Sequence, residues 1–514
     1  MHSQRTAFLK RKRVASTGTG TGGAARKIKR LARTGAATAA KHALSLGPHP
    51  YGIKPMGNMF FSNVPERRTR GLGHFTVLPD DLLVTVFQTY FDGEALGRLC
   101  QASPALYCFI HHEEIWRSLV VREFKGSFQF QTTWKQTFKY MKAPERFVLE
   151  RPISCAGIFS DYLFAAWRCA TVPLEDLCGI QVDTIDHRTK LTYEQFRNDY
   201  LIPNKPVLIK NVASQWPAFH KWSNDYILKH CGDRVFRAEA VDIEFKDYLQ
   251  YARSCMEESP LYLFDKKFAD EGSALAKDYE VPAIFKEDFF ALLGDQRPDY
   301  RWLIIGPKRS GSTFHVDPNS TSAWNAVIKG EKKWILYPPE LPPPGVMPSE
   351  DGSEVTSPLS LTEWFLNHYE ETKAGPYRPV ECVCRPGEIL FVPCGWWHCV
   401  MNMSDSIAIT QNFVSSENLG QVLEFLKDRR EQVSGSAFGE GLYEKFTEKL
   451  REHRPDLLRQ HEARLERCSI DVSSEPKPSK PSKPSKPSLW DKMAQAPAEE
   501  SISAGGLFSF GSEE

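Results

Sequence analysis

The sequence lacks any apolar run of about 18 residues, the length that a helix needs to cross a bilayer. Its N-terminus also lacks the apolar stretch of a secretory signal and is instead rich in arginine, threonine and glycine. The twelve cysteines include no CxxC pair and do not form the dense framework typical of small secreted domains. We therefore expect an intracellular protein with reduced thiols and no membrane partner.

Acidic residues are almost missing from the first 70 positions, which hold 15 Lys and Arg against one acid, Glu66. The other 444 residues hold 50 bases and 63 acids, so the net charge of +1 hides a basic arm on a mildly acidic body. Such an arm is typical of nuclear or nucleic-acid-associated proteins. The body lacks the positive charge that nucleic-acid binding requires, and its acidic bias is compatible with a Lys/Arg-rich protein substrate.

Residues 1–70 lack sustained periodicity and are expected to form a disordered arm. Two basic clusters, at residues 10–13 and 26–30, are separated by 12 residues. This spacing matches a bipartite nuclear-import signal, which predicts an import carrier as a partner and the nucleus as the location. The alternative is a solvated basic tail that contacts RNA or nothing.

Residues 74–125 change to a helical pattern, with apolar residues at helical spacing and Pro79 at a first-turn position. Leu78 and Pro79 open the segment, Trp116 and Arg117 follow later, and with these landmarks the segment resembles an F-box. The resemblance implies docking of a ubiquitin-ligase adaptor. The alternative is a helical subdomain packed on the body, because three short helices rarely stand alone.

Short apolar runs bounded by Gly, Pro or charge recur through residues 150–416. Four of them have the length of buried strands, at residues 206–209, 302–305, 334–337 and 389–393. Many short strands with turn signals predict a sandwich or barrel, so we expect a mainly β fold with α additions. Residues 338–357 are rich in Pro and acid and are expected to form an exposed loop.

Apolar residues return to helical spacing in residues 417–468. These C-terminal helices could form a homodimer, or they could simply cap the barrel. The last segment, residues 472–514, contains the repeat PKPSKPSKPSKPS, in which the prolines favour an extended, solvated chain. We expect a disordered Lys/Pro/Ser-rich tail.

The string GSTFHVDP holds His315 and Asp317 two residues apart, so on an extended strand both side chains leave the same face. Far downstream, His398 follows the apolar run at residues 389–393. Two histidines and one carboxylate suit octahedral Fe(II) and leave positions open for a chelating cosubstrate and dioxygen. The alternatives are a surface HxD at a strand end and a histidine packed against neighbouring tryptophans, because short motifs often match by chance.

The sequence around these residues closely resembles the Jumonji-C family of 2-oxoglutarate, Fe(II)-dependent oxygenases. The resemblance is carried by GPKRSGSTFHVDPNSTSAWNAVIKGEKKWILYPP and RPGEILFVPCGWWHCVMNMSDSIAITQNF, and it runs from Pro206 to Asn418, about 210 of the 514 residues. Within the family the chain is similar to the nuclear branch once named phosphatidylserine receptor, described as lysyl hydroxylase and arginine demethylase. The resemblance implies a double-stranded β-helix (cupin or jelly-roll) core, and an F-box ahead of it resembles a fungal and plant architecture.

Carried over position by position, the resemblance implies that His315, Asp317 and His398 are the catalytic iron ligands. It implies that Lys332 pairs with the distal carboxylate of 2-oxoglutarate and that Thr410 adds a second hydrogen bond to it. A buried ammonium is the partner that a carboxylate needs when it leaves water. Three further polar residues match positions near the cosubstrate and metal: Asn325, Asn412 and Ser312, the last where the branch usually has threonine. Lys333, on the opposite strand face from Lys332, is expected to face solvent.

The implied reaction is hydroxylation of an unactivated C–H bond with Fe(II), dioxygen and 2-oxoglutarate, which is decarboxylated to succinate. On a lysine side chain the product is hydroxylysine. On an N-methyl carbon the hydroxylated product is unstable, so the outcome is demethylation. The leading hypothesis is therefore a nuclear protein hydroxylase or demethylase, with the F-box-like helices as a targeting accessory.

Three alternatives stay open at this point. The chain could be a ubiquitin-ligase substrate receptor whose Jumonji-C domain only binds partners, although a scaffold has no physical need for iron ligands. It could act on a small molecule or on tRNA, because the same iron chemistry serves many substrates. The cysteines near His398 could hold zinc, but their spacing fits structural zinc sites poorly and buried thiols are the better interpretation. These cysteines are Cys382, Cys384, Cys394 and Cys399.

Overall fold

The structure is a computed structural model that describes residues 47–473 except 271 and 375–377. The chain divides into two compact units, Met1–His49 and Pro50–Glu514, and every element named below belongs to the second. The two basic clusters of the arm and the repeat of the tail lie outside the described residues.

Residues 50–70 differ from the disordered arm expected for them. Ile53 is buried, and Arg68 begins a short helix and pairs with Asp80 at 2.7 Å. Structured chain therefore begins before the helical pattern does, because this segment contributes its own side chains to the packing of the helices that follow.

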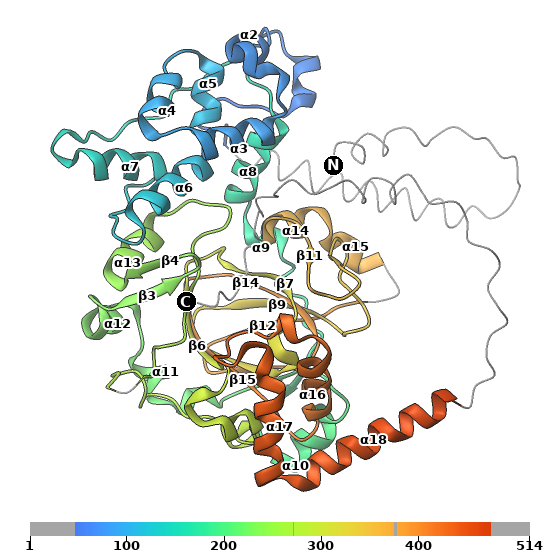
Figure 1. Cartoon of the computed structure of the whole chain (residues 1–514). Coiled ribbons are helices and arrows are strands. Elements are labelled where there is room, and N and C mark those ends of the chain that lie inside the picture. Colours follow the sequence, from blue (N-terminus) through green and yellow to red (C-terminus); the bar gives the residue numbers. More distant parts are fainter. Residues whose placement is uncertain (1–46, 271, 375–377, 474–514) are drawn as a thin grey trace, which may run out of the picture. The chain divides into compact units, whose positions relative to one another are not determined.

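Two β-sheets form the centre of the protein (Figure 1). The large sheet has nine strands in the order β1-β2-β13-β8-β15-β6-β5-β3-β4, and the small sheet has four in the order β12-β9-β14-β7. The large-sheet strands are β1 (Asp186–Arg188), β2 (Val207–Ile209), β3 (Val235–Ala238), β4 (Val241–Glu244), β5 (Leu263–Asp265), β6 (Arg301–Gly306), β8 (Ser322–Lys329), β13 (Ile389–Val392) and β15 (Ser406–Phe413). The small-sheet strands are β7 (Gly311–His315), β9 (Lys332–Tyr337), β12 (Val380–Cys384) and β14 (Trp397–Asn402). A separate hairpin, β10 (Met347–Pro348) and β11 (Val355–Thr356), lies within the expected loop.

The small sheet packs face to face against the middle of the large sheet. Alternate residues of β9 show this: Trp334 and Leu336 pack with Leu390 of the large sheet, whereas Ile335 and Tyr337 belong to a different cluster on the outer face. Every strand pair within β6–β9 and β12–β15 is antiparallel, four strands to each sheet. The expected mainly β fold with a double-stranded β-helix core is therefore confirmed.

The outer face of the small sheet is covered, and the expectation that Lys333 faces solvent is wrong. The Lys333 side chain is fully buried and its Nζ pairs with Glu381 at 2.8 Å. It also donates hydrogen bonds to the carbonyls of Gly179 and Val182. Strand alternation predicts which face a side chain leaves, but not that other elements cover this face. These elements are α9 (Leu174–Leu177), α14 (Leu361–Asn367) and α15 (Tyr369–Ala374).

Six helices before the sheets form what we call the helical module (drawn in blue to green-blue in Figure 1). They are α2 (Arg68–Leu72), α3 (Asp80–Tyr90), α4 (Gly93–Leu99), α5 (Pro104–Ile110), α6 (Glu113–Phe124) and α7 (Trp134–Lys142). Local signals start them: Ser103 caps α5 by accepting from Leu106 N, and Pro104 occupies the first turn.

The helical module packs on the body, and one hydrophobic cluster joins the two. The cluster runs from Leu83 of α3 through Trp134 of α7 and Tyr251 of α13 to Ile305 and Phe391 of the large sheet. Four more helices surround the large sheet or precede it: α8 (Asp161–Thr171), α11 (Pro217–Lys221), α12 (Asn224–Cys231) and α13 (Phe245–Ser254). This packing is what the helical-subdomain interpretation expects, and adaptor binding by the module stays a prediction.

The C-terminal helices pack against one end of the barrel. They are α16 (Leu419–Asp428), α17 (Leu442–His453) and α18 (Pro455–Ser473). The short α10 (Tyr193–Phe196) ends before Arg197, which pairs with Glu417 at 2.6 Å just ahead of α16. Val422 and Phe446 are buried with Phe290 and Val414 of the body. The helices thus cap the barrel, and dimerisation through them stays a prediction. Across residues 47–473, as far as they are described, none of the helices is both long and apolar enough to cross a membrane.

The buried Lys333–Glu381 pair yields a stability prediction. Lys333→Met leaves a buried carboxylate without its cation, so we expect the free energy of unfolding to fall by about 3 kcal/mol. Chemical denaturation at neutral pH measures this loss. Replacing both partners, as Lys333→Met with Glu381→Leu, removes the uncompensated charge and should recover most of the loss.

The matched control is the exposed pair of Arg385 and Glu331, whose side chains are about half exposed. Arg385→Met should cost less than about 1 kcal/mol. Equal effects of Lys333→Met and Arg385→Met would contradict the burial described here.

Candidate metal centre

Strands β7 and β14 place two histidines directly opposite each other. His315, the last residue of β7, pairs in register with His398 of β14, and their ring centroids lie 4.2 Å apart. The next register pair is Val400 with Ser312. Between the two pairs β14 advances by two residues and β7 by three, so β7 has one extra residue. This β-bulge changes the phase of β7 and turns both Ser312 and His315 toward the interior, where Val400 also points.

Asp317 follows β7 immediately and completes a set of three. One ligand atom from each of His315, Asp317 and His398 lies within 4.8 Å of the other two, close enough to hold a single metal ion. Within the described residues this is the one group of three or more His, Cys, Asp or Glu side chains with such geometry.

Backbone carbonyls fix the orientation of both imidazole rings. Nδ1 of His315 lies 2.7 Å from the carbonyl oxygen of Thr313, and Nδ1 of His398 lies 3.0 Å from that of Trp396. Because a carbonyl only accepts, each Nδ1 must carry the proton, and Nε2 is left as the nitrogen with the lone pair. Such a hydrogen bond on the far nitrogen is the usual arrangement behind a metal-ligating histidine.

The electrostatics of the three side chains suit a cation. Burial lowers the pKa of His398 to about 4. Burial also lowers the pKa of His315, and the neighbouring His398 lowers it further, so both rings are neutral near pH 7. Burial raises the pKa of Asp317, against the opposing effects of His315 and a hydrogen bond from Asn412. Oδ2 of Asp317 is buried without a hydrogen-bond partner among the described residues, which is costly for a carboxylate unless a cation binds it. The donor set of two nitrogens and one oxygen therefore fits Fe(II) with positions left open.

The four cysteines near His398 do not form a second metal cluster. Cys382 and Cys384 point into the barrel, whereas Cys399 points to the outer face of the small sheet. These three and Cys394 are all buried free thiols. The interpretation as buried thiols is favoured over zinc because the sheet separates the side chains.

A buried lysine lies deeper in the barrel. Lys332 of β9 has no exposed surface, and its ammonium donates to Oδ1 of Asn402 at 2.9 Å and to the hydroxyl of Tyr262. Asn402 is four residues beyond His398 on the same inward face of β14, in register with Lys332. Burial lowers the pKa of Lys332 to about 7. Sequence reasoning missed Tyr262 and Asn402 as partners of Lys332, because only the strand register brings them together.

Thr410, Asn325 and Ser312 point into the same interior. Thr410 and Asn325 pair across β15 and β8, and the Thr410 hydroxyl donates to the carbonyl of Trp324 at 3.0 Å. Oδ1 of Asn325 is buried and has no hydrogen-bond partner among the described residues. Trp302, which pairs with Thr410, packs against Tyr262, so Thr410 and Lys332 share one part of the barrel.

The sequence matches the family described as a cupin-like domain over residues 193–418. It is 43% identical over 422 residues to the arginine-specific demethylase JMJ22 of Arabidopsis thaliana, an alignment that covers 81% of this chain and 84% of that protein. The chain belongs to the Jumonji-C family. It is thus an iron- and 2-oxoglutarate-dependent dioxygenase, of the branch that resembles the phosphatidylserine receptor.

Two further relatives carry different activities in their names. The Caenorhabditis elegans bifunctional arginine demethylase and lysyl-hydroxylase psr-1 is 36% identical over 281 residues, covering 52% of this chain and 68% of that protein. The Danio rerio 2-oxoglutarate and iron-dependent oxygenase JMJD4 is 31% identical over 284 residues, covering 48% of this chain and 63% of that protein.

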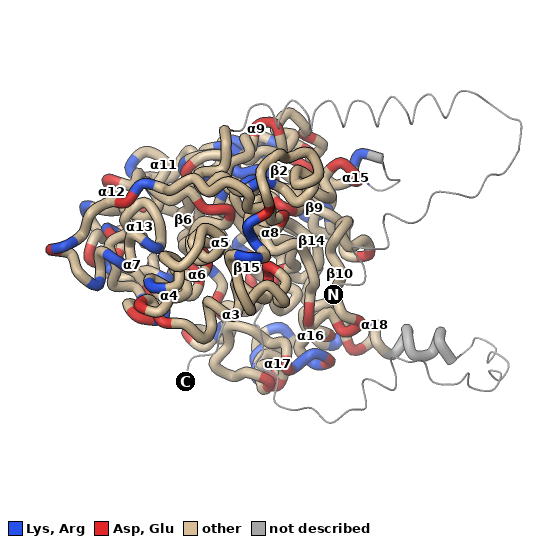
Figure 2. Tube along the Cα trace, turned by 90° about the horizontal axis from the view of Figure 1, so that it is seen from above, with Lys and Arg blue, Asp and Glu red and all other residues tan. Residues whose placement is uncertain are grey.

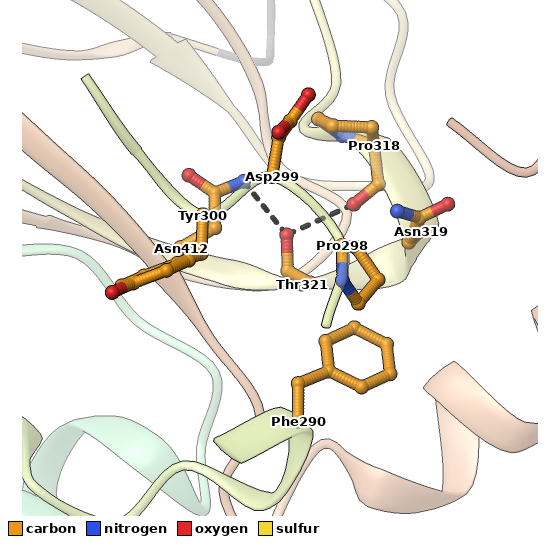
Figure 3. A pocket seen from close by; sticks show the side chains of 8 residues that line it. All are labelled: Phe290, Pro298, Asp299, Tyr300, Pro318, Asn319, Thr321 and Asn412. Atoms are coloured by element: carbon orange, nitrogen blue, oxygen red, sulfur yellow. Dashed lines mark hydrogen bonds between the residues drawn. The ribbon is translucent and has the colours of Figure 1, made fainter. Parts of the chain in front are cut away.

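A small pocket lies beside Pro318, the residue that follows Asp317 in this Jumonji-C domain (Figure 3). Asn412 forms part of its wall and donates to the Thr321 hydroxyl at 2.8 Å, and Thr321 donates to the carbonyl of Pro318 at 2.9 Å. Asn412 also reaches the Asp317 carboxylate. The remaining lining residues are Phe290, Pro298, Asp299, Tyr300 and Asn319. The pocket thus lies beside the side chain that orients Asp317.

The lowered pKa of Lys332 makes carboxylate binding pH-dependent. Above about pH 7 the free lysine is largely neutral, whereas a bound carboxylate favours its ammonium form and raises its pKa. Binding of 2-oxoglutarate then takes up a proton, so we expect its affinity to fall about tenfold per pH unit as pH rises above about 7. Calorimetry on the manganese-loaded protein measures this slope.

In Lys332→Met the slope should disappear and the affinity should stay low at every pH. Lys329→Met is the matched control, because Lys329 ends the preceding strand, β8 of the large sheet, and donates to the carbonyl of Phe219 at 3.0 Å. A wild-type affinity that does not change with pH would exclude Lys332 as the carboxylate partner.

Proposed function

We propose that this Jumonji-C enzyme hydroxylates side chains of Lys/Arg-rich protein substrates, as lysyl hydroxylation, N-methyl demethylation or both. The observation that carries the proposal is the His315–Asp317–His398 group beside a small pocket, with the buried Lys332 deeper in the same barrel. The names of the Arabidopsis and nematode relatives, demethylase and lysyl-hydroxylase, support the substrate class.

In this proposal His315, Asp317 and His398 hold the iron. Bound there, iron supplies the activation of dioxygen that couples decarboxylation of 2-oxoglutarate to C–H hydroxylation. The Thr313 and Trp396 carbonyls hold the two rings in the ligating tautomer, and Asn412 orients the Asp317 carboxylate. The protein thereby fixes the geometry of the centre before substrate arrives.

The cosubstrate is bound deeper in the barrel by Lys332 and Thr410. The ammonium of Lys332 neutralises the distal carboxylate, and the Thr410 hydroxyl exchanges its bond to the Trp324 carbonyl for one to the same carboxylate. Asn325 and Ser312 line the space between them with polar groups, and Oδ1 of Asn325 is buried there without a hydrogen-bond partner among the described residues. Trp302 and Tyr262 exclude water from this part of the barrel.

The proposed substrate is a protein, and the proposed location is the nucleus. Acidic and basic residues are interspersed over the described elements in Figure 2, and Asp299, which lines the pocket, pairs with Lys266 at 3.0 Å. Support for a Lys- or Arg-rich substrate comes from the acidic bias of the chain after residue 70. Entry into the nucleus through an import carrier rests on the basic clusters at residues 10–13 and 26–30 alone.

Succinate release from 2-oxoglutarate tests the proposal directly. The iron-loaded protein should release succinate, and a pooled set of Lys/Arg-rich peptides should stimulate the release. His398→Ala should reduce turnover to background, because one of three ligands is lost. His453→Ala, which removes an exposed histidine of α17, is the matched control and should keep full turnover.

The outcomes separate the hypotheses. Stimulation by a tRNA pool or small molecules but not by peptides would replace the protein-substrate proposal. Failure of the intact protein to bind iron would exclude the enzyme mechanism altogether.

Docking of a ubiquitin-ligase adaptor is a second candidate function of the helical module. The observation that favours it is the exposure of Val77 (81%) and Leu82 (45%) at the start of α3, beside the Leu78–Pro79 landmark. Leu82→Glu should abolish capture of a purified adaptor while succinate release stays intact. Gln101→Glu, at an exposed turn after α4, should leave both unchanged. Absence of adaptor binding by the intact protein would remove this function.

A further inference from the structure

Residues 257–262 lead into β5 and end at Tyr262, whose hydroxyl contacts Lys332. Side chains hold this segment in place. Tyr251 of α13 accepts from the backbone N–H of Leu261 at 2.8 Å and donates to Glu257 at 2.7 Å. Tyr248 of the same helix donates to the Leu261 carbonyl at 3.0 Å. The position of the Tyr262 hydroxyl therefore depends on how this segment is held.

The helical module supplies a further contact to the segment through Arg117 of α6. Its Nη2 pairs with Glu239 at 2.7 Å, and its Nη1 lies 3.3 Å from Glu257 and donates to the carbonyl of Ser259 at 3.0 Å. The other carboxylate oxygen of Glu239 accepts from the backbone N–H of Tyr262 at 3.3 Å. Contacts thus run from Arg117 through Glu239 to the backbone N–H of Tyr262, and the hydroxyl at the other end of the Tyr262 side chain contacts Lys332.

The turn that carries Glu239 is itself constrained. Glu239 has a φ of 51°, the left-handed region that residues with a Cβ seldom occupy, and it connects β3 to β4. The module also approaches β4, the strand that follows this turn, with its backbone, because a Cβ at Gly126 would lie 1.4 Å from the carbonyl oxygen of Asp242. The helical module therefore contacts the β3–β4 hairpin as well as the side chain of Glu239.

The two carboxylates need the guanidinium between them. Glu239 and Glu257 are largely buried, with 14% and 8% of their side chains exposed, and Arg117 is 23% exposed. Without Arg117 the two negative charges would repel each other in a site with little water. At least one of them would turn away, and the segment before Tyr262 would lose its anchor.

We propose that Arg117 is a positioning residue for 2-oxoglutarate: by holding Glu239 and residues 257–262, it sets the Tyr262 hydroxyl that orients Lys332. The proposal rests on the proposed role of Lys332 as the partner of the cosubstrate carboxylate. In this proposal the helical module helps to shape the cosubstrate site from outside, independently of any partner that the module binds. Arg117 itself touches neither cosubstrate nor metal ligands.

The test compares Arg117→Gln with Arg122→Gln, which removes an arginine of the same helix whose contact is the carbonyl of Gln88 at 3.5 Å. In Arg117→Gln we expect the Kd and KM for 2-oxoglutarate to rise about tenfold, the effect of one lost charge-assisted contact. The affinity for manganese and kcat at saturating 2-oxoglutarate should be unchanged. Arg122→Gln should alter none of these quantities.

The variant Tyr262→Phe distinguishes failure of the Arg117 proposal from failure of the proposed role of Lys332. It should raise the Kd for 2-oxoglutarate by itself, and combining it with Arg117→Gln should add little, since both act on one hydroxyl. A raised Kd in Tyr262→Phe with a normal Kd in Arg117→Gln overturns the role of Arg117 and leaves the proposed function intact. A normal Kd in both Tyr262→Phe and Lys332→Met overturns the cosubstrate role of Lys332 itself.

A general loss of structure would give a different pattern. If Arg117→Gln lost manganese binding as well as 2-oxoglutarate binding, its role would be structural and the proposal would fail. Arg117→Lys keeps the charge without the two-pronged geometry, so it should fall between wild type and Arg117→Gln in Kd. If Arg117→Gln does not fold, Arg117→Lys decides: a Kd equal to that of wild type would also overturn the proposal.

Discussion

The pairing of β7 with β14 is the constraint on which the rest of the site depends. Two strands that are more than eighty residues apart in sequence meet in register at His315 and His398, and a bulge in β7 corrects the phase of the residues before them. Without the bulge, Ser312 and His315 would leave opposite faces, because they are three positions apart. With it, the interior receives both residues, and Asp317 emerges at the rim beside solvent. The strand pairing that forms the barrel wall therefore also sets the positions of the metal-ligand candidates.

The buried polar groups of this barrel differ in how far they lie from its opening. The metal-ligating candidates lie near the opening, where His315 and Asp317 keep partial exposure, and the cationic Lys332 lies where no surface is exposed. Burial lowers the pKa of Lys332 and of His398 and so favours the neutral form of both side chains. The neutral imidazole is the form that ligates a metal cation, whereas a bound carboxylate would favour the ammonium form of Lys332. The metal and the cosubstrate carboxylate would therefore bind at different depths of the same interior.

Much of the fold and the candidate site could be predicted from the sequence. The apolar runs that became β6, β9 and β13 could be recognised as short buried strands. His315, Asp317 and His398 were predicted from an HxD pair and a distant histidine beside such a run, together with the family resemblance of the surrounding sequence. Three features required the structure. The bulge depends on cross-strand register, the partners of Lys332 come from strands distant in sequence, and the burial of Lys333 depends on helices that cover the small sheet. The local sequence pattern predicts which face of a strand a side chain leaves, but not which other elements cover that face.

The helical module shows the same limit at a larger scale. Part of the module could be predicted from apolar spacing, whereas its junction with the body is made by Tyr251, Gly126 and Arg117, of which the sequence singled out Arg117 alone, as an F-box landmark. The hydrophobic cluster shared by module and sheet has a practical consequence for dissecting the enzyme. A catalytic fragment cut at about residue 150 would present the apolar surface around Phe236 and Tyr251 to water, and it would tend to aggregate. The helical module is therefore a structural cover for the oxygenase domain as well as an extension of it.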